Sequence, residues 1–114
     1  MEYNKLKDLA VEAADLYDIL NKKNGHNTWT YREYLEGLTG DLGDLHKLLT
    51  AKRGYRYIDG DLDEKVAHEL VDCLWSLILI AKNLNVDLEK EFVENMQSLK
   101  TQLVQKLSAD VPVK

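Results

Sequence analysis

The stretch AHELVDCLWSLILIA, residues 67–81, decides the fold of this chain. From Val71 to Ala81 it is apolar on almost every side of a helix, and only Asp72 and Ser76 interrupt the run. A helix that is apolar all round has to be buried on more than one side. In a chain of 114 residues, we expect the second covering surface to be another subunit.

Three further segments carry the same helical spacing of apolar residues. The expected helices span 3–22, 29–53, 62–83 and 88–108, separated by turn-forming residues at 21–28, 53–61 and 83–87. The expected N-caps are Asn27 or Thr28 for the second helix, Asp61 for the third and Asp87 for the fourth. The last residues, 109–114, are expected to fray. Four amphipathic helices with short connections predict a single all-α domain over residues 1–114, built as a four-helix bundle.

The composition excludes several classes of protein. Six glycines and one proline are too few for a turn-rich β-sandwich or barrel. A net charge of −5 without a basic cluster argues against binding nucleic acid. Cys73 is the only cysteine, so an intrachain disulfide and a cysteine-based zinc site are both excluded. The start of the chain lacks a secretory pattern, and the longest uncharged apolar stretch, 73–81, is too short to span a membrane. We therefore expect a cytoplasmic protein that does not bind membranes.

Two pairs of acidic residues hold matching positions on the second and third helices. Asp41 and Asp44 lie at one edge of the second helix's apolar stripe, and Glu69 and Asp72 lie at the same edge of the third helix's stripe. The two stripes are Leu38, Leu42, Leu45 and Leu49, and Val66, Leu70, Cys73 and Leu77. If both stripes face one shared core, the four carboxylates converge.

Converging carboxylates favour a metal ion as their partner. Carboxylates beside an apolar surface are costly unless they are neutralised, and residues three apart on a helix repel each other when both are acidic. Mg²⁺ relieves both problems because it prefers oxygen ligands, and Mn²⁺ would serve as well. The alternative is that these are ordinary solvated acids at the boundary of a stripe.

The same residues carry a resemblance to a known family. GDLGDL (40–45), followed by AHELVDCLW (67–75), resembles the MazG-like, all-α nucleoside triphosphate pyrophosphohydrolases. Their paired motif is E-x-x-E followed by E-x-x-D, and here the two elements are separated by 24 residues. NLNVDLEKEF (83–92) is similar to the family's run into its last helix, so the resemblance covers about 29–95. Both glutamates of the first element are aspartates in this chain, which implies closer helices, bridging waters or a weakened activity.

The resemblance implies an activity and a set of site residues. The implied reaction is Mg²⁺-dependent cleavage of a nucleoside triphosphate, (d)NTP, to its monophosphate and pyrophosphate, as nucleotide-pool house-cleaning. The implied metal ligands and catalytic residues are Asp41, Asp44, Glu69 and Asp72. One of these carboxylates is expected to position or deprotonate the attacking water. Family members are typically dimers or tetramers, so the resemblance also implies a homodimer or homotetramer.

Several residues outside the acidic pairs are candidates for contacting the substrate. Trp29 either stacks on the nucleobase or seals the end of the core. Lys52 and Arg53 either reach the phosphates or simply stabilise a helix C-terminus. Asn95 and Lys100 are the only residues of the last helix that match the family's phosphate-binding cluster.

Three predictions remain open beside this interpretation. Trp75 lies opposite the stripe of the third helix, so we expect it to be exposed in a monomer and covered in a dimer. The substrate could instead be another phosphoanhydride, such as phosphoribosyl-ATP. A protein of a different class, a non-catalytic helical interaction module with the same fold, would also explain the aspartate replacements and the reduced basic cluster.

Overall fold

Helices are the only regular secondary structure over residues 2–109, which are the residues that the computed structural model describes. Its four helices are α1 (Tyr3–Lys23), α2 (Tyr31–Lys52), α3 (Leu62–Asn83) and α4 (Leu88–Ser108). The all-α class and the four predicted helices are confirmed, and no strand occurs between residues 2 and 109. The expected fraying of 109–114 concerns residues that, apart from Ala109, lie outside this range. None of the described helices combines the length and apolarity needed to cross a bilayer.

Side-chain caps fix where three of the helices begin. Thr30 caps α2, because its hydroxyl accepts a hydrogen bond from the Arg32 amide at 3.3 Å and its own amide donates to Glu33 at 3.3 Å. The prediction of Asn27 or Thr28 as this cap is wrong, since Thr30 has the glutamate three residues later that completes a capping box. Asp61 and Asp87 cap α3 and α4 as predicted.

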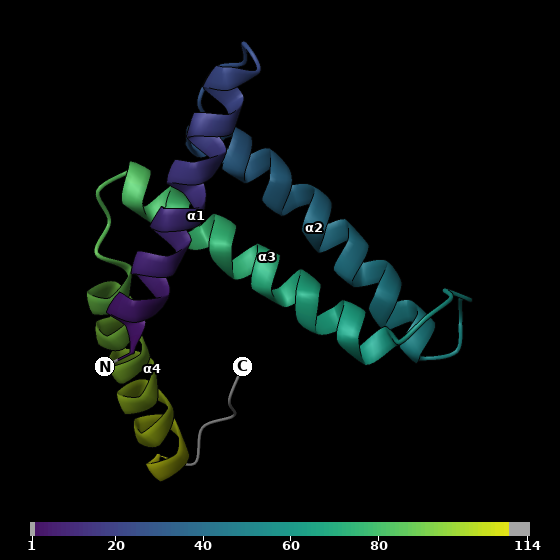
Figure 1. The fold of residues 1–114 in the computed structure, drawn as a ribbon. Coiled ribbons are helices and arrows are strands. Elements are labelled where there is room, and N and C mark those ends of the chain that lie inside the picture. Colours follow the sequence, from purple (N-terminus) through teal and green to yellow (C-terminus); the bar gives the residue numbers. More distant parts are fainter. Residues whose placement is uncertain (1, 110–114) are drawn as a thin grey trace.

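The helices α2 and α3 form an antiparallel hairpin, and α1 crosses the end of that hairpin where α2 begins and α3 ends (Figure 1). The core that joins these three helices contains Ala10, Ala14, Tyr34, Ile78 and Leu79. The two alanines let α1 approach closely, because they present little side-chain bulk. The arrangement is compatible with a helical bundle, but α4 points away from the hairpin instead of completing it.

Trp75 lies under α1 and does not face outward. Its indole Nε1 donates a hydrogen bond to the carbonyl of Ala10 at 3.0 Å, and its ring packs against Tyr34. The expectation that Trp75 is exposed in a single chain is therefore wrong, because α1 occupies the side of α3 opposite its predicted stripe.

The faces that α2 and α3 turn toward each other match the predicted stripes only in part. Leu38 and Cys73 are buried as predicted. Leu42, Leu49, Leu70 and Leu77 were expected in the core, yet each keeps about half of its surface exposed. The residues buried in their place include Leu48 and Ala51 on α2 and Ser76 and Leu79 on α3. The contact between the helices is thus rotated toward the acidic edge of each stripe. This rotation brings carboxylates into the helix–helix interface.

The helix α4 does not bury its apolar face. Its apolar residues at steps of three and four were expected to enter the bundle core, but none of its residues is buried. Phe92 is 61% exposed and Leu107 is 69% exposed. At the start of α4, Leu88 packs against the core of the other helices.

Candidate metal centre

Three of the four predicted carboxylates meet between α2 and α3. Asp41 on α2, and Glu69 and Asp72 on α3, each offer an oxygen, and these three oxygens all lie within 4.8 Å of one another. All three side chains are half-buried. They are half-buried because the contact between α2 and α3 is rotated, and this rotation moves the three residues from the edge of the helix–helix interface into the interface. We refer to Asp41, Glu69 and Asp72 as the carboxylate cluster.

Burial and repulsion within the cluster raise the pKa values of two of its carboxylates. Burial, followed by repulsion from Asp72 and Asp44, raises the pKa of Asp41, although a hydrogen bond with Glu69 and the nearby His68 act in the opposite direction. Burial and then repulsion from Asp41, Asp44 and Asp72 raise the pKa of Glu69. Removing charged groups from water and crowding like charges both favour the protonated form.

The fourth predicted carboxylate, Asp44, lies beside the cluster but outside it. Its side chain is exposed and it does not belong to the group of oxygens that meet. Its charge nonetheless raises the pKa of both Asp41 and Glu69, so it is an electrostatic neighbour of both. On the α3 side, Nε2 of His68 lies 3.3 Å from the Asp72 carboxylate, one helical turn away.

The cluster fits a divalent cation on the chemistry of its donors. One oxygen of Glu69, Oε2, is buried without a hydrogen-bond partner, which is costly unless something else neutralises it. Two ligands of one Mg²⁺ are separated by about 3 to 4 Å, given metal–oxygen distances of about 2.1 Å. The observed separations of up to 4.8 Å therefore require only small side-chain movements.

A cavity of about 610 Å³ opens on one side of the cluster. Its lining includes four aromatic residues, Tyr17, Trp29, Tyr34 and Trp75, and four acidic ones, Asp41, Asp72, Glu33 and Glu36. The rings of Tyr17 and Trp29 are stacked with centroids 5.2 Å apart, and Tyr34 meets Trp29 edge to face. We call this space the aromatic cavity. Trp29 takes part both in lining it and in packing against the core, so the two interpretations of this residue are compatible.

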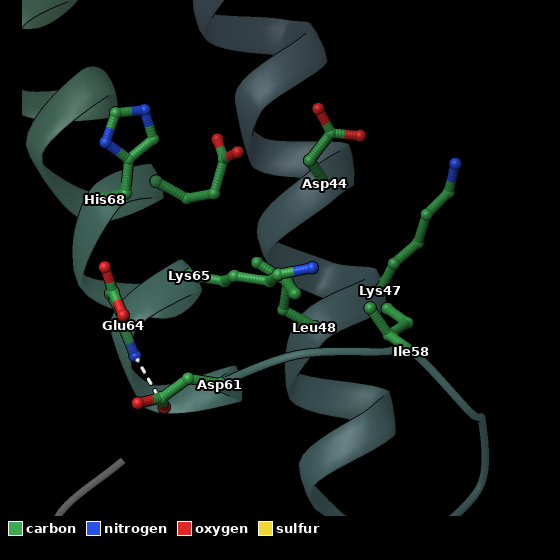
Figure 2. A pocket seen from close by; sticks show the side chains of 9 residues that line it. Asp44, Lys47, Leu48, Ile58, Asp61, Glu64, Lys65 and His68 are labelled. Carbon is green, nitrogen blue, oxygen red and sulfur yellow. Dashed lines mark hydrogen bonds between the residues drawn. The ribbon is translucent and has the colours of Figure 1, made fainter.

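A second cavity, of about 550 Å³, opens toward the loop that joins α2 and α3. Its lining is mixed in charge: the carboxylates of Asp44, Asp61, Glu64 and Glu69 lie around it together with Lys47, Lys65 and His68, and Ile58 of the loop closes its end. Figure 2 shows Lys65 extending from α3 toward α2, while Asp61 accepts a hydrogen bond at the start of α3. We call this space the loop cavity. The carboxylate cluster thus borders an aromatic space on one side and a space with two lysines on the other.

The remaining candidates are not at the cluster. Lys52 is paired with Asp63 at the far end of the hairpin, and Arg53 lies over the ring of Tyr55 at the end of α2. Asn95 and Lys100 are exposed on α4, where the Asn95 amide donates to the Glu91 carbonyl at 2.6 Å. None of these four residues lines the aromatic cavity or the loop cavity.

Sequence reasoning missed residues that the fold brings to the two cavities. Lys47 was interpreted as a solvated charge, and Lys65, Tyr17 and Tyr34 were not singled out at all. Lys65 lies four residues before Glu69, and this spacing alone puts it on the same face of α3. Tyr17 and Tyr34 offered no such signal, because their proximity depends on how α1 crosses the hairpin.

Comparison of the chain with protein-family models, curated proteins and solved structures finds no match. The resemblance to the MazG-like family therefore rests on the motifs in the sequence.

Proposed function

We propose that the chain is a Mg²⁺-dependent nucleotide pyrophosphohydrolase that cleaves a (d)NTP to the monophosphate and pyrophosphate. The observation that carries the proposal is the position of the carboxylate cluster, between an aromatic cavity and a cavity with two lysines. A nucleoside triphosphate has the same order of chemical groups, with an aromatic base at one end and anionic phosphates at the other. Its α-phosphate would lie at the carboxylates.

The metal would be held by Asp41, Glu69 and Asp72, and the charge of Asp44 beside them would add to its attraction. Mg²⁺ or Mn²⁺ bound there supplies Lewis-acid stabilisation of phosphoryl oxygens and a water of lowered pKa. Carboxylates of α2 and of α3 would bind the same metal ion, so the two helices would fix its position relative to the substrate. One of the four carboxylates would position the attacking water or accept its proton.

The aromatic cavity would hold the base. Stacking on an aromatic ring is worth about 1 to 3 kcal/mol per base and tolerates every base, because each has a π-face. Trp29 is the residue best suited to this contact, since it lines the cavity and is only half-buried. In the loop cavity, Lys47 and Lys65 would contact the phosphates, and Lys65 would do so by giving up the hydrogen bond that its ammonium donates to the Asp59 carbonyl at 2.6 Å. The sequence had instead offered Lys52, Arg53, Asn95 and Lys100 as candidates for contacting the phosphates.

This function belongs to a cytoplasmic, homo-oligomeric enzyme that removes a surplus or noncanonical nucleotide. Phosphoribosyl-ATP is the alternative substrate for the same chemistry, because it also has a base and a phosphoanhydride. A non-catalytic interaction module is the competing class, favoured by the exposed apolar side chains of α4.

Product chromatography on a panel of (d)NTPs and phosphoribosyl-ATP with Mg²⁺ tests the proposal. We expect a monophosphate and pyrophosphate from at least one nucleotide, and loss of turnover in Glu69→Gln. Glu12→Gln removes an exposed carboxylate of α1 that lines neither cavity, so this control should keep full activity. Diphosphate and orthophosphate as main products would refute the mechanism. Absence of turnover on the whole panel would favour the interaction module.

A further inference from the structure

The charged side chains that line the aromatic cavity all have the same sign. They are Glu33, Glu36, Asp41 and Asp72, and no lysine, arginine or histidine between residues 2 and 109 lines this cavity. The loop cavity differs, because two lysines and a histidine lie among its carboxylates. The two sides of the carboxylate cluster therefore favour ligand groups of different charge, and the aromatic side favours a positive one.

The four aromatic rings of the cavity form a closed circuit. Tyr17 and Trp29 are stacked with centroids 5.2 Å apart, and Trp29 meets Tyr34 edge to face at 5.8 Å. Trp75 closes the circuit, with its centroid 5.4 Å from that of Tyr34 and 5.8 Å from that of Tyr17. The face of an aromatic ring is the negative part of its quadrupole, so it attracts a cation within about 6 Å of the centroid. Groups of aromatic rings recognise organic cations in this way.

Two of the four carboxylates keep their charge when a metal ion is bound. Asp41 and Asp72 belong to the carboxylate cluster, where a divalent cation would neutralise them. Glu33 lies outside the cluster and accepts only the uncharged amide and hydroxyl of Thr30, at 3.3 and 3.1 Å. Glu36 is exposed and forms no ion pair with any residue between 2 and 109. A positive group in the cavity would find these two glutamates uncompensated.

The negative charge also acts on the rings from the α1 side. Burial, followed by the charges of Asp18, Asp15 and Glu33, raises the pKa of the Tyr34 hydroxyl. Asp18 in addition accepts a hydrogen bond from the Trp29 amide at 3.4 Å. A surrounding that opposes a further negative charge favours a positive one.

The cavity has room for a flat ring. Its volume of about 610 Å³ lies within the range of about 300 to 1,000 Å³ that is usual for small-molecule sites. Its α2 wall is open at Gly37, because a Cβ at this position would have no atom of the protein within 4 Å. A neutral planar ring gains from stacking alone, whereas a cationic planar ring gains from stacking and from cation–π attraction.

We propose that the aromatic cavity binds a nucleobase that carries a positive charge, as adenine does after methylation at its ring nitrogen N1. The identification of the ligand as a nucleotide rests on the proposed function, and the charge of the cavity narrows the noncanonical substrate to alkylated, cationic bases. Methylation at N1 leaves adenine protonated at neutral pH, whereas methylation at the exocyclic nitrogen leaves it neutral. The two methyladenosines are isomers, so they separate charge from size.

Binding of these two nucleosides tests the proposal without catalysis. 1-Methyladenosine and N6-methyladenosine are titrated in a chelator at pH 7 and followed by tryptophan fluorescence. The chain has two tryptophans, Trp29 and Trp75, and both line the cavity. We expect 1-methyladenosine to bind about tenfold more tightly, within the factor of about 2 to 30 that a cation–π contact supplies. Equal affinity for the two isomers, or binding of neither, would overturn the proposal.

Variants of α2 test where the cation binds. Glu36→Gln should weaken 1-methyladenosine a few-fold, as expected for an exposed ion pair, and leave N6-methyladenosine unchanged. Glu12→Gln removes an exposed carboxylate outside both cavities and should change neither affinity. Gly37→Leu should block both nucleosides, whereas Gly40→Leu should block neither, because Gly40 has equally open surroundings but lines neither cavity. Circular dichroism verifies that both leucine variants are folded. A preference for 1-methyladenosine that survives Glu36→Gln and Gly37→Leu would overturn the proposal, since the cation would then bind elsewhere.

Turnover of the corresponding triphosphates separates this proposal from the proposed function. With Mg²⁺, 1-methyl-dATP should have a higher kcat/KM than N6-methyl-dATP. A preference for the cationic nucleoside without turnover of any triphosphate would support the charge selection by the cavity and refute the pyrophosphohydrolase. Turnover of (d)NTPs without any preference for the cationic isomer would support the pyrophosphohydrolase and overturn the present proposal.

Discussion

The α2–α3 hairpin and α4 both consist of capped, amphipathic helices, but the hairpin buries residues and α4 buries none. The helix α3 has 22 residues, of which five are buried, whereas α4 has 21 residues and none is buried. Both begin at an aspartate cap, and both carry apolar residues at helical spacing. The difference teaches that amphipathic periodicity predicts a helix and its apolar face, but not which surface covers that face.

A pair of core truncations should separate the two regions most strongly. Leu79→Ala removes a side chain that is 1% exposed at the junction of α1, α2 and α3, so it should lower the free energy of unfolding by about 2 to 5 kcal/mol. Phe92→Ala on α4 should lower it by less than about 1 kcal/mol at concentrations where the protein is monomeric. Urea denaturation measures both values. An equally large loss in Phe92→Ala under those conditions would show that α4 packs on its own chain.

The fold was predictable to the extent that it depends on local sequence. Helix positions, the Asp61 and Asp87 caps and the all-α class follow from periodicity and capping chemistry, which act over a few residues. The rotation of α2 against α3 was not predictable, because Leu42 and Leu70 are as apolar as the residues that replaced them in the interface. That choice depends on how side chains of two helices and of α1 fill one space.

The candidate site, like the fold, was predictable from the sequence only in part. The matching positions of Asp41, Glu69 and Asp72 on two helices were visible in the sequence, and these three carboxylates meet. The aromatic cavity was not visible, since Tyr17 and Tyr34 belong to helices that cross only in three dimensions. Lys52 and Arg53 do not lie beside the cluster, contrary to the prediction. They lie at the end of α2, next to the loop that joins α2 and α3, where Asp63 and Tyr55 contact them.

The hairpin should also differ from α4 in its response to pH, because only the hairpin contains crowded carboxylates. The pKa values of Asp41 and Glu69 are raised in the folded state. As pH rises above about 4, the unfolded chain releases these protons first, so the stability of the metal-free protein falls until pH exceeds the raised pKa values. Glu69→Gln removes one of the charges. Its melting temperature in a chelator should therefore equal or exceed that of the wild type at pH 7, with the difference vanishing near pH 4.

Differential scanning fluorimetry across pH measures this effect, with Glu12→Gln as the control for loss of an ordinary exposed carboxylate. Mg²⁺ at ten times its dissociation constant should stabilise the wild type by about 1.4 kcal/mol, because it binds the folded state only. The same addition should leave Glu69→Gln almost unchanged. A Glu69→Gln variant that is less stable at pH 7, together with a wild type that ignores Mg²⁺, would make Glu69 a structural residue.

The smallest expected effects come from removing the N-caps of α2 and α4. Thr30→Ala removes the capping box of α2, which is part of the cooperative hairpin, and should cost about 1 kcal/mol of global stability. Asp87→Ala removes the hydrogen bond to the Lys90 amide at the start of α4, at 3.1 Å. Because α4 adds no buried residue to the core, its fraying should leave the denaturation midpoint of the monomer within a few tenths of a kcal/mol. Far-UV circular dichroism should instead show a loss of helix. A loss of global stability in Asp87→Ala that matches Thr30→Ala would contradict this, since it would make α4 part of the same cooperative unit as the hairpin.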